Sequence, residues 1–594
     1  MIGTYAAVVA VCGASLAIGQ AAIGLCGRRS WSWLSPAVGL ALVCAVCWAT
    51  VRMPGDGVVS AIVVLALVVA SIAYLWGRLE GGGEALRVGL PVALVALLAA
   101  SLPLAVEGHF GILGTSFNPD MSQHLLATAR LADGHSSQLL NQGYPLGPHS
   151  VVVALNKGLG IGLVQGFGGL SVAVMVLAPL TALTAFRDLG VLPRTAGALV
   201  VGLAYVVASY FAQGAFKETI EALLVLAFVL ALREATKPGW RELPLRFVPA
   251  GLVAVGAVYA YSFPGLIWMV GAFVIWALAS FAFERRWPAP RAVGLGLLVF
   301  AVLVAPEIGR MIDFHRFETF DPNGPGLGNL FGQVSPFEAL GIWPSGDFRL
   351  AAGDGAVPAA CYYLGVAFAL VLLAYGIARC WTRRETAILS GLSAAAIAYL
   401  AARAGGTAYT AAKAIEIAAP LVALTITLPL AADADWRIGP PLGGRNRQSL
   451  VSGLALALFV FAAGACSALA FANAPVGPTS YSPALTGLRP LVAPGSTLVI
   501  ASPTLLADEH GTPYIAWELR GGRVCIAAEG ELDGLTRGVR FVVTRGSPGG
   551  APFPGLKVRK VAPPYVLWEA TAPVAAKGPC PLIAVRQARQ GPAR

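Results

Sequence analysis

An acidic residue and a histidine stand one helical turn apart in a stretch that ends at Gly134. Asn118 suits a helix N-cap, Pro119 suits the first helical position and Gly134 suits a stop, so a helix of about fourteen residues is predicted. Asp120 falls in its first turn and His124 follows on the same face. The carboxylate can act as a general base, or it can only stabilise the helix start through the helix dipole.

Charged residues at the edges of apolar runs form a second set of candidates. A charge inside a membrane is costly, so it is a candidate for function by default. These residues are Lys217, Glu218 and Glu221 at one run, Lys413 and Glu416 at another, and Glu307 with Arg310 beside a third. Structural roles stay open for all three groups: an acidic helix start, an i, i+3 ion pair and an interfacial anchor pair.

The composition determines where these residues must act. Of 594 residues, 57% are hydrophobic and 12% are charged, with a mean hydropathy of +0.73. About 25% charged residues would be usual in a soluble domain. The chain is therefore an all-α polytopic membrane protein, and not a cytosolic enzyme, a secreted disulfide scaffold or a disordered chain. Its net charge of +11 indicates cytoplasmic loops rather than a nucleic-acid partner.

Apolar runs near the length of a membrane span predict about fourteen transmembrane helices. The runs lie at 3–26, 35–52, 57–77, 88–106, 167–186, 195–210, 218–235, 247–262, 264–283, 292–306, 359–378, 386–402, 408–432 and 448–472. Alternate loops hold nineteen Lys or Arg in one set and nine in the other. The richer set is expected to be cytoplasmic, which places Met1 and everything after residue 473 outside.

Two of the outer loops are long, at 107–166 and 307–358, and long loops usually carry function or are disordered. The tail at 474–594 is less apolar and predicts a small extracytoplasmic α/β domain. Its β-like runs are Ser496–Ala501, Val524–Ala528, Arg540–Thr544, Leu556–Val561 and Tyr565–Ala570, with a helix-like segment at Pro513–Leu519. Cys525 and Cys580 are the only cysteines in this outer region, where an oxidising compartment permits a disulfide between them.

After the predicted helix, the first outer loop continues to a turn and then to a second amphipathic segment. This order resembles the GT-C superfamily of membrane glycosyltransferases, whose first long outer loop opens with an acidic residue. A surface helix of the form D…A…L..G and a YPPG-like turn follow it. The matching residues are Asp120, Ala127, Ala129, Leu131, Gly134 and Tyr144-Pro145-Leu146-Gly147. The resemblance covers about residues 88–190; the remaining spans match by general plan.

Two departures from the family pattern concern a metal ion and the N-terminal spans. Met121 replaces the frequent second acidic residue, which weakens the argument for a divalent metal but leaves one possible as a cofactor. The histidines of the first loop, His109, His124, His135 and His149, match no metal-ligand spacing, so no metal ligands are assigned. Three spans also precede the helix that leads into the loop.

The resemblance implies transfer of a sugar from a polyprenyl-phosphate donor to an envelope glycan, lipid or protein on the outer side, with inversion. Such a displacement needs one carboxylate base, unlike the paired carboxylates of glycosidases, and cations for the leaving phosphate. Asp120 is the expected base. The expected substrate-binding residues are His124, Tyr144, His149, Lys217, Glu218, Glu221, Arg310, Trp343, Asp347, Arg349, Lys413 and Glu416. Trp343, Asp347 and Arg349 can either hold a sugar or plug the cavity structurally.

The expected organisation has three parts: extra N-terminal helices at 1–87, a GT-C-like core at 88–472 and the outer domain at 473–594. The chain is expected in a bacterial plasma membrane, with the lipid bilayer, the donor and the acceptor as partners. Two other functions stay open. One is a transporter or flippase of envelope or lipid-linked material, although no internal repeat is found. The other is a non-catalytic membrane scaffold.

Overall fold

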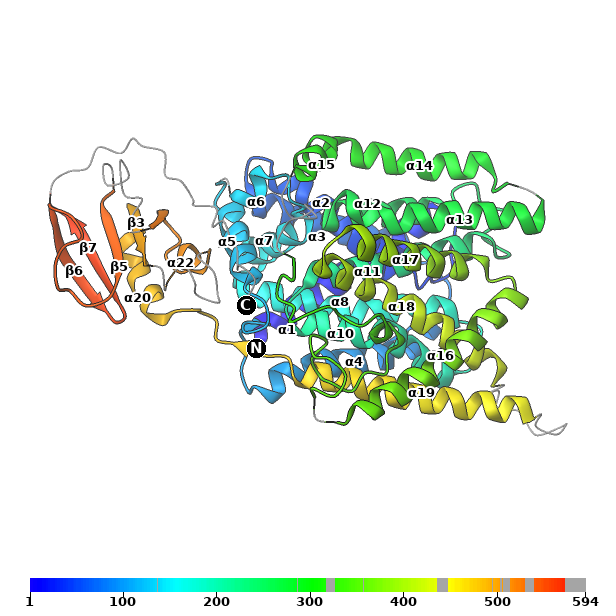
Figure 1. Ribbon diagram of the computed structural model, residues 1–594. Helices are drawn as coiled ribbons and strands as arrows, with labels where there is room; N and C mark the ends of the chain where they lie inside the picture. Colours follow the sequence, from blue (N-terminus) through cyan, green and yellow to red (C-terminus); the bar gives the residue numbers. More distant parts are fainter. Residues whose placement is uncertain are drawn as a thin grey trace.

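The structure is a computed structural model, described here for residues 1–135, 137–285, 287–316, 326–355, 357–434, 447–493, 495–502, 505, 513–528 and 539–571. Within these residues, ten helices are long and apolar enough to cross a membrane. They form a bundle with roughly parallel axes, and the outer domain projects from one end of it (Figure 1). The chain is thus a multi-pass membrane protein with a mostly helical fold.

The ten long helices comprise eight single helices and two that continue a neighbouring short helix. They are α1 (Ile2–Leu25), α3 (Asp56–Leu75), α4 (Gly82–Val106), α8 (Leu163–Phe186), α13 (Leu266–Glu284, preceded by the 3₁₀ turn Phe263–Gly265), α14 (Pro290–Val304, continued by α15, Ile308–His315), α16 (Ala359–Thr382), α17 (Thr386–Gly405), α18 (Ala408–Asp433) and α19 (Arg447–Ala472). A bent pair, α9 (Val191–Gly202) and α10 (Tyr205–Ala212), turns by 49° and makes an eleventh if counted as one span.

Three of the fourteen expected spans are helical, but each is too short or too highly charged to count as a membrane-spanning helix by length and composition. The helices α2 (Ser35–Val51) and α12 (Val248–Tyr261) are only 17 and 14 residues long. The third, α11 (Phe216–Ala235), carries five charged residues in 20. All three are nevertheless packed inside the bundle, so each of the fourteen apolar runs is helical in the structure.

The centre of the bundle consists of α8, α11 and α18, whose residues are buried almost throughout. The N-terminal helices belong to the same core: α1 packs on α2 and α8, and α2 packs on α12. The Trp48 indole on α2 even donates a 2.7 Å hydrogen bond to Glu307, beside α15. The helices expected as an N-terminal addition, at 1–87, are therefore packed into the same bundle as the rest of the core.

One end of the bundle, called here the α5 end, carries the short helices of the long loops (Figure 1). These are α5 (Asp120–Ala132), α6 (Gln138–Asn141), α7 (Gly147–Leu159) and the 3₁₀ helix Pro336–Leu340. The expected surface helix is α5, with 13 residues. The side chain of Asn118 caps it by accepting the Asp120 backbone N–H at 3.0 Å, although the residue at the N-cap position is Pro119.

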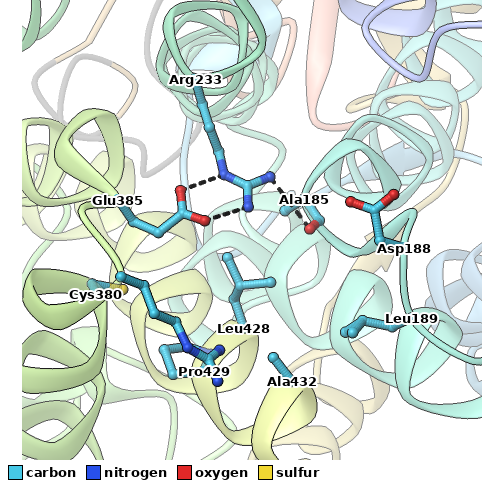
Figure 2. A pocket seen from close by; sticks show the side chains of 10 residues that line it. Ala185, Asp188, Leu189, Arg233, Cys380, Glu385, Leu428, Pro429 and Ala432 are labelled. Carbon is cyan, nitrogen blue, oxygen red and sulfur yellow. Dashed lines mark hydrogen bonds and ion pairs between the residues drawn. The ribbon is translucent and has the colours of Figure 1, made fainter. Parts of the chain in front are cut away.

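The opposite end of the bundle is held together by ion pairs. Arg233 is nearly buried and makes a two-pronged contact of 2.6 Å with Glu385, while one Nη also reaches the Ala185 carbonyl (Figure 2). Arg187 pairs with Glu234 at 2.6 Å, and Arg379 with Asp433 at 2.6 Å. This concentration of arginine is what the positive-inside rule expects of a cytoplasmic face.

The outer domain is built on a sheet of five strands over the described residues, in the order β4-β3-β5-β7-β6. The strands are β3 (Ser496–Ala501), β4 (Arg523–Ala528), β5 (Phe541–Arg545), β6 (Leu556–Ala562) and β7 (Tyr565–Ala570). The first three are parallel and the last two add antiparallel. The helices are α20 (Pro483–Val492) and α22 (Pro513–Glu518), so the expected α/β domain is present. Cys525 is disulfide-bonded; its expected partner Cys580 lies outside the described residues.

Candidate active site

Two glycines bring the segment before α5 against the turn before α11. Gly114 and Gly214 both have positive φ, at +77° and +75°, which favours glycine. A Cβ on Gly114 would lie 2.1 Å from the Gln213 backbone, and one on Gly214 would lie 2.6 Å from the Leu113 carbonyl oxygen. No side chain fits between these backbones. The contact therefore places the start of α5, with Asp120, beside the start of α11, with Lys217.

Asp120 is the carboxylate of this junction. Its side chain keeps contact with solvent, but the surrounding protein displaces enough water that burial raises its pKa above the ordinary value. The positive charges of Lys217 and Lys413 oppose that rise. Neither lysine has its nitrogen within 4.0 Å of the carboxylate in the described part of the chain. The carboxylate is thus near enough to both cations for their charges to act on it, but it forms an ion pair with neither.

The two lysines differ in their partners. Lys413 on α18 forms an ion pair of 2.9 Å with Glu218 on α11, and both side chains are largely withdrawn from solvent, at 15% and 5% exposure. Lys217 has no carboxylate partner among the described residues; its ammonium lies 4.2 Å from the centre of the Tyr144 ring. An ammonium without an anion is the group that a phosphate can neutralise. Lys413 makes a similar cation–π contact: its ammonium lies 4.3 Å from the centre of the Tyr409 ring.

His124 and His149 form a buried pair behind Asp120. His124 Nδ1 lies 3.1 Å from His149 Nε2, and Tyr144 and Phe216 pack edge-on around them. Burial lowers the pKa of His149 to about 3, and burial together with His149 holds the pKa of His124 well below its usual range. Both rings are therefore neutral near pH 7. They support Tyr144 and α5 rather than supplying a positive charge.

The Arg310 side chain holds the Tyr144 turn by hydrogen bonds to the backbone of that turn. It donates to the Tyr144 carbonyl at 2.6 Å and to the Leu140 carbonyl at 3.2 Å, and it pairs with Glu307 at 3.3 Å. Glu307 also accepts a hydrogen bond from the Trp48 indole and forms an ion pair with Arg52. Each of the three guanidinium nitrogens thus has a partner within the protein. Arg310 therefore positions the turn, and its expected contact with a substrate stays a prediction.

The second long loop holds the first one in place. Asp347 and Arg349 pair with each other at 2.7 Å, and both are nearly buried. The Arg349 guanidinium lies 4.0 Å from the Phe117 ring, three residues before Asp120. Trp343 is buried edge-on against Tyr362, so neither face of its indole is free for a sugar. All three residues thus contact other parts of the chain in this structure, and their part in holding a sugar stays a prediction.

Glu221 and Glu416 lie deeper between α11 and α18 and are fully buried. No hydrogen-bond partner in the described residues reaches any of their four carboxyl oxygens. A Cβ at Gly265 would lie 2.8 Å from the Glu221 carboxyl group, so a larger residue there would displace this side chain. Both carboxyl groups lack solvent contact, and their expected part in substrate binding stays a prediction. They lie below the Lys413–Glu218 pair.

One cavity lies away from this site and does not contribute to it. Its volume is about 160 Å³; it lies at the opposite end of the bundle and is lined by Arg233, Glu385 and Cys380 among others (Figure 2). Arg233 and Glu385 pair with each other, while Arg383 pairs with Asp433, so the cavity belongs to the ion-pair cluster described above. No group of three or more His, Cys, Asp or Glu in the described residues could hold a metal ion.

Several residues that shape the site carry no sequence signal of function. Asn329 joins the two outer loops by donating to the Phe117 carbonyl at 3.0 Å and to Gln213 at 2.5 Å. Phe117 and Gln213 stand beside motif residues, but only their contacts across more than a hundred residues show their importance. Gly114 and Gly214 were the sequence signal available for this arrangement, since a close contact between two backbone segments needs glycine.

The buried histidine pair predicts a pH-dependent stability. An unfolded histidine has a pKa near 6.5, so below that pH the unfolded chain gains protons that folded His149 does not take up until about pH 3. Stability is full above about pH 6.5 and falls by about 1.4 kcal/mol per pH unit for each such histidine below it. His149→Phe keeps an aromatic ring. Its melting temperature in detergent should fall less from pH 7.5 to pH 5 than that of the wild type; equal falls would contradict this.

No protein-family model and no curated protein matches the chain. Among solved structures, the arabinofuranosyltransferase AftD from Mycobacteria superposes with a TM-score of 0.51 at 16% identity. The match covers 82% of this chain but only 40% of AftD. ArnT from Cupriavidus metallidurans, solved bound to undecaprenyl phosphate, has a TM-score of 0.47 at 12% identity, with 84% of this chain and 100% of ArnT covered. The fold expected from the first outer loop is confirmed: over most of its length the chain shares the fold of this arabinofuranosyltransferase.

Proposed function

We propose that the chain is an inverting membrane glycosyltransferase that takes a sugar from a polyprenyl-phosphate donor. The reaction occurs at the α5 end, and the acceptor is an envelope glycan, lipid or protein with a free hydroxyl group. One observation carries the proposal. A solvent-accessible carboxylate, Asp120, lies close to Lys217 and Lys413 but pairs with neither.

The separation of the Asp120 carboxylate from the two lysine ammonium groups suits a displacement reaction. A base and a phosphate-binding cation in direct contact would neutralise each other and leave no room for a reacting sugar. Here Glu218 pairs with Lys413, and Lys217 keeps its charge available. The raised pKa of Asp120 also makes it a better proton acceptor than an ordinary surface carboxylate.

In the reaction, Asp120 takes the proton of the acceptor hydroxyl as its oxygen attacks the anomeric carbon. The bond between that carbon and the phosphate oxygen breaks, and its electron pair leaves with the polyprenyl phosphate. The lysines stabilise the charge that develops on this phosphate. Attack opposite the leaving group inverts the anomeric configuration. Tyr144 supports Lys217 through the cation–π contact.

Replacement of Asp120 by Asn tests the base. Asn keeps the size and the helix start but cannot take a proton, so the rate of sugar transfer should fall by about 10²- to 10⁴-fold. The assay follows sugar release from polyprenyl phosphates that carry single pentoses or hexoses, in membranes that hold equal amounts of protein. Asp133→Asn, at the other end of α5, is the matched control and should stay within about twofold of the wild type.

The Asp120→Asn result also separates the proposal from its alternatives. A flippase or a scaffold has no proton to remove, so its activity or assembly would survive this substitution. Full sugar transfer by correctly folded Asp120→Asn would refute Asp120 as the base. A melting temperature close to that of the wild type is the check on folding.

We also propose that the α5 end and the outer domain face outward, because arginines crowd the opposite end. Exposed Ser547 in the outer domain and exposed Thr236 after α11 are suitable probes. In a Cys361→Ser background, a membrane-impermeant maleimide should label Ser547→Cys in intact cells. It should label Thr236→Cys only after permeabilisation. The reverse pattern would place the site on the cytoplasmic side.

A further inference from the structure

The cavity opposite the α5 end has an apolar floor and a charged rim (Figure 2). Its volume is about 160 Å³, whereas a single water needs only about 10–15 Å³ of such space, so it admits a larger group. Leu428, Pro429 and Cys380 form the buried floor. Asp188 and Arg383 also line the cavity and are exposed to solvent, so a ligand can enter on their side.

Arg383 is a second cation on a carboxylate that is already occupied. Asp433 accepts two bonds from Arg379, at 2.6 and 2.8 Å, and one from the Tyr375 hydroxyl at 2.6 Å. Arg383 reaches the same carboxylate through one Nη only, and its side chain has no other polar partner among the described residues. A guanidinium carries five N–H donors. Most donors of Arg383 are therefore left for solvent or a ligand.

The surrounding ion-pair cluster as a whole has an excess of positive charge. Glu234 alone pairs with three basic side chains, at 2.6 to 3.7 Å. Over the described residues, six basic side chains of the cluster face four carboxylates. They are Arg28, Arg187, Arg233, Lys237, Arg379 and Arg383 against Asp188, Glu234, Glu385 and Asp433. The ion pairs thus leave two positive charges of this cluster without compensation.

A phosphate group matches this cavity in size and in charge. A guanidinium binds a phosphate through paired N–H donors, and the phosphate brings the negative charge that the cluster lacks. Basic pockets between membrane helices on the cytoplasmic side bind the head groups of anionic lipids. The arginines make this end the expected cytoplasmic end. Both a phospholipid of that leaflet and a soluble phosphate can therefore supply the group.

We infer that the cavity binds a phosphate group, with Arg383 as its main ligand. The site is separate from the candidate active site. Arg233, which lines the cavity, and Lys217 lie sixteen residues apart on α11, which is about 24 Å along an α-helix. The inference therefore does not rest on the proposed function. A phosphate held here compensates the excess charge where α8, α11 and α18 end, and so stabilises that end of the bundle.

The test is a thermal-shift titration of the full-length protein in detergent. The probes are dioleoylphosphatidylglycerol, which is anionic, dioleoylphosphatidylcholine, which is neutral overall, and inorganic phosphate, with sodium chloride at matched ionic strength as the control. A ligand of the folded state raises the melting temperature. A rise with phosphatidylglycerol alone supports the site and identifies a lipid head group. A rise with inorganic phosphate beyond that with chloride supports the site and identifies soluble phosphate.

Arg383→Gln is the decisive variant. It removes the available cation but leaves Asp433 paired with Arg379, so the fold should persist. The probe concentration at the half-maximal shift should rise by about tenfold, as expected for a lost charged hydrogen bond. Arg384→Gln makes the same charge change outside the cavity lining and should stay within about twofold of the wild type. Asp188→Asn removes a negative charge from the rim and should lower this concentration by about threefold, a gain that misfolding cannot produce.

No rise with either anionic probe above the chloride and phosphatidylcholine controls would overturn the inference. Equal half-maximal concentrations in Arg383→Gln and Arg384→Gln would do the same. Loss of the shift in Lys217→Gln, with Arg383→Gln unchanged, would assign the bound phosphate to the α5 end and also overturn it. None of these measurements depends on sugar transfer, so a failure here leaves the proposed function standing.

Discussion

The ion pair between Lys413 and Glu218 is the constraint on which the site depends. It joins α18 and α11 in the centre of the bundle, at a distance of 2.9 Å. Removing one partner of such a pair leaves an uncompensated buried charge and costs about 3–5 kcal/mol. The pair fixes the register of the two helices. It therefore fixes the height of Lys217, the neighbour of Glu218 and the cation that keeps no anionic partner in the described residues.

The outer loops then bring the carboxylate to these cations. Backbone contact at Gly114 and Gly214 sets how close the loop before α5 approaches α11. Arg349 clamps Phe117 from the second loop, and Arg310 holds the carbonyl of Tyr144. These arginines use their charge within the protein. The site thus separates two uses of positive charge: arginines order the loops, and lysines remain for a ligand.

Local pattern predicted the helices, the strands of the outer domain and the helix that starts at Asp120, because each follows from neighbouring residues. The approach of Lys217 and Lys413 followed only from their shared depth. For Trp343, Asp347 and Arg349 the sequence left two roles open, since a polar loop residue has the same sequence signal whether it faces a ligand or another loop. The contact of the outer domain with α5 had no local signal, because it joins Leu126 to residues almost four hundred positions later.

The central claim is that Lys217 and Lys413 receive a lipid phosphate on one side of Asp120. The most direct measurement is a cryo-electron microscopy map of the full chain in lipid nanodiscs with added undecaprenyl phosphate. The account predicts phosphate density within hydrogen-bond distance of Lys217 Nζ, near Lys413, with the Asp120 carboxylate facing it across a gap that admits a sugar. Phosphate density at the opposite end of the bundle, beside Arg233 and Arg383, with none near Lys217, would contradict it.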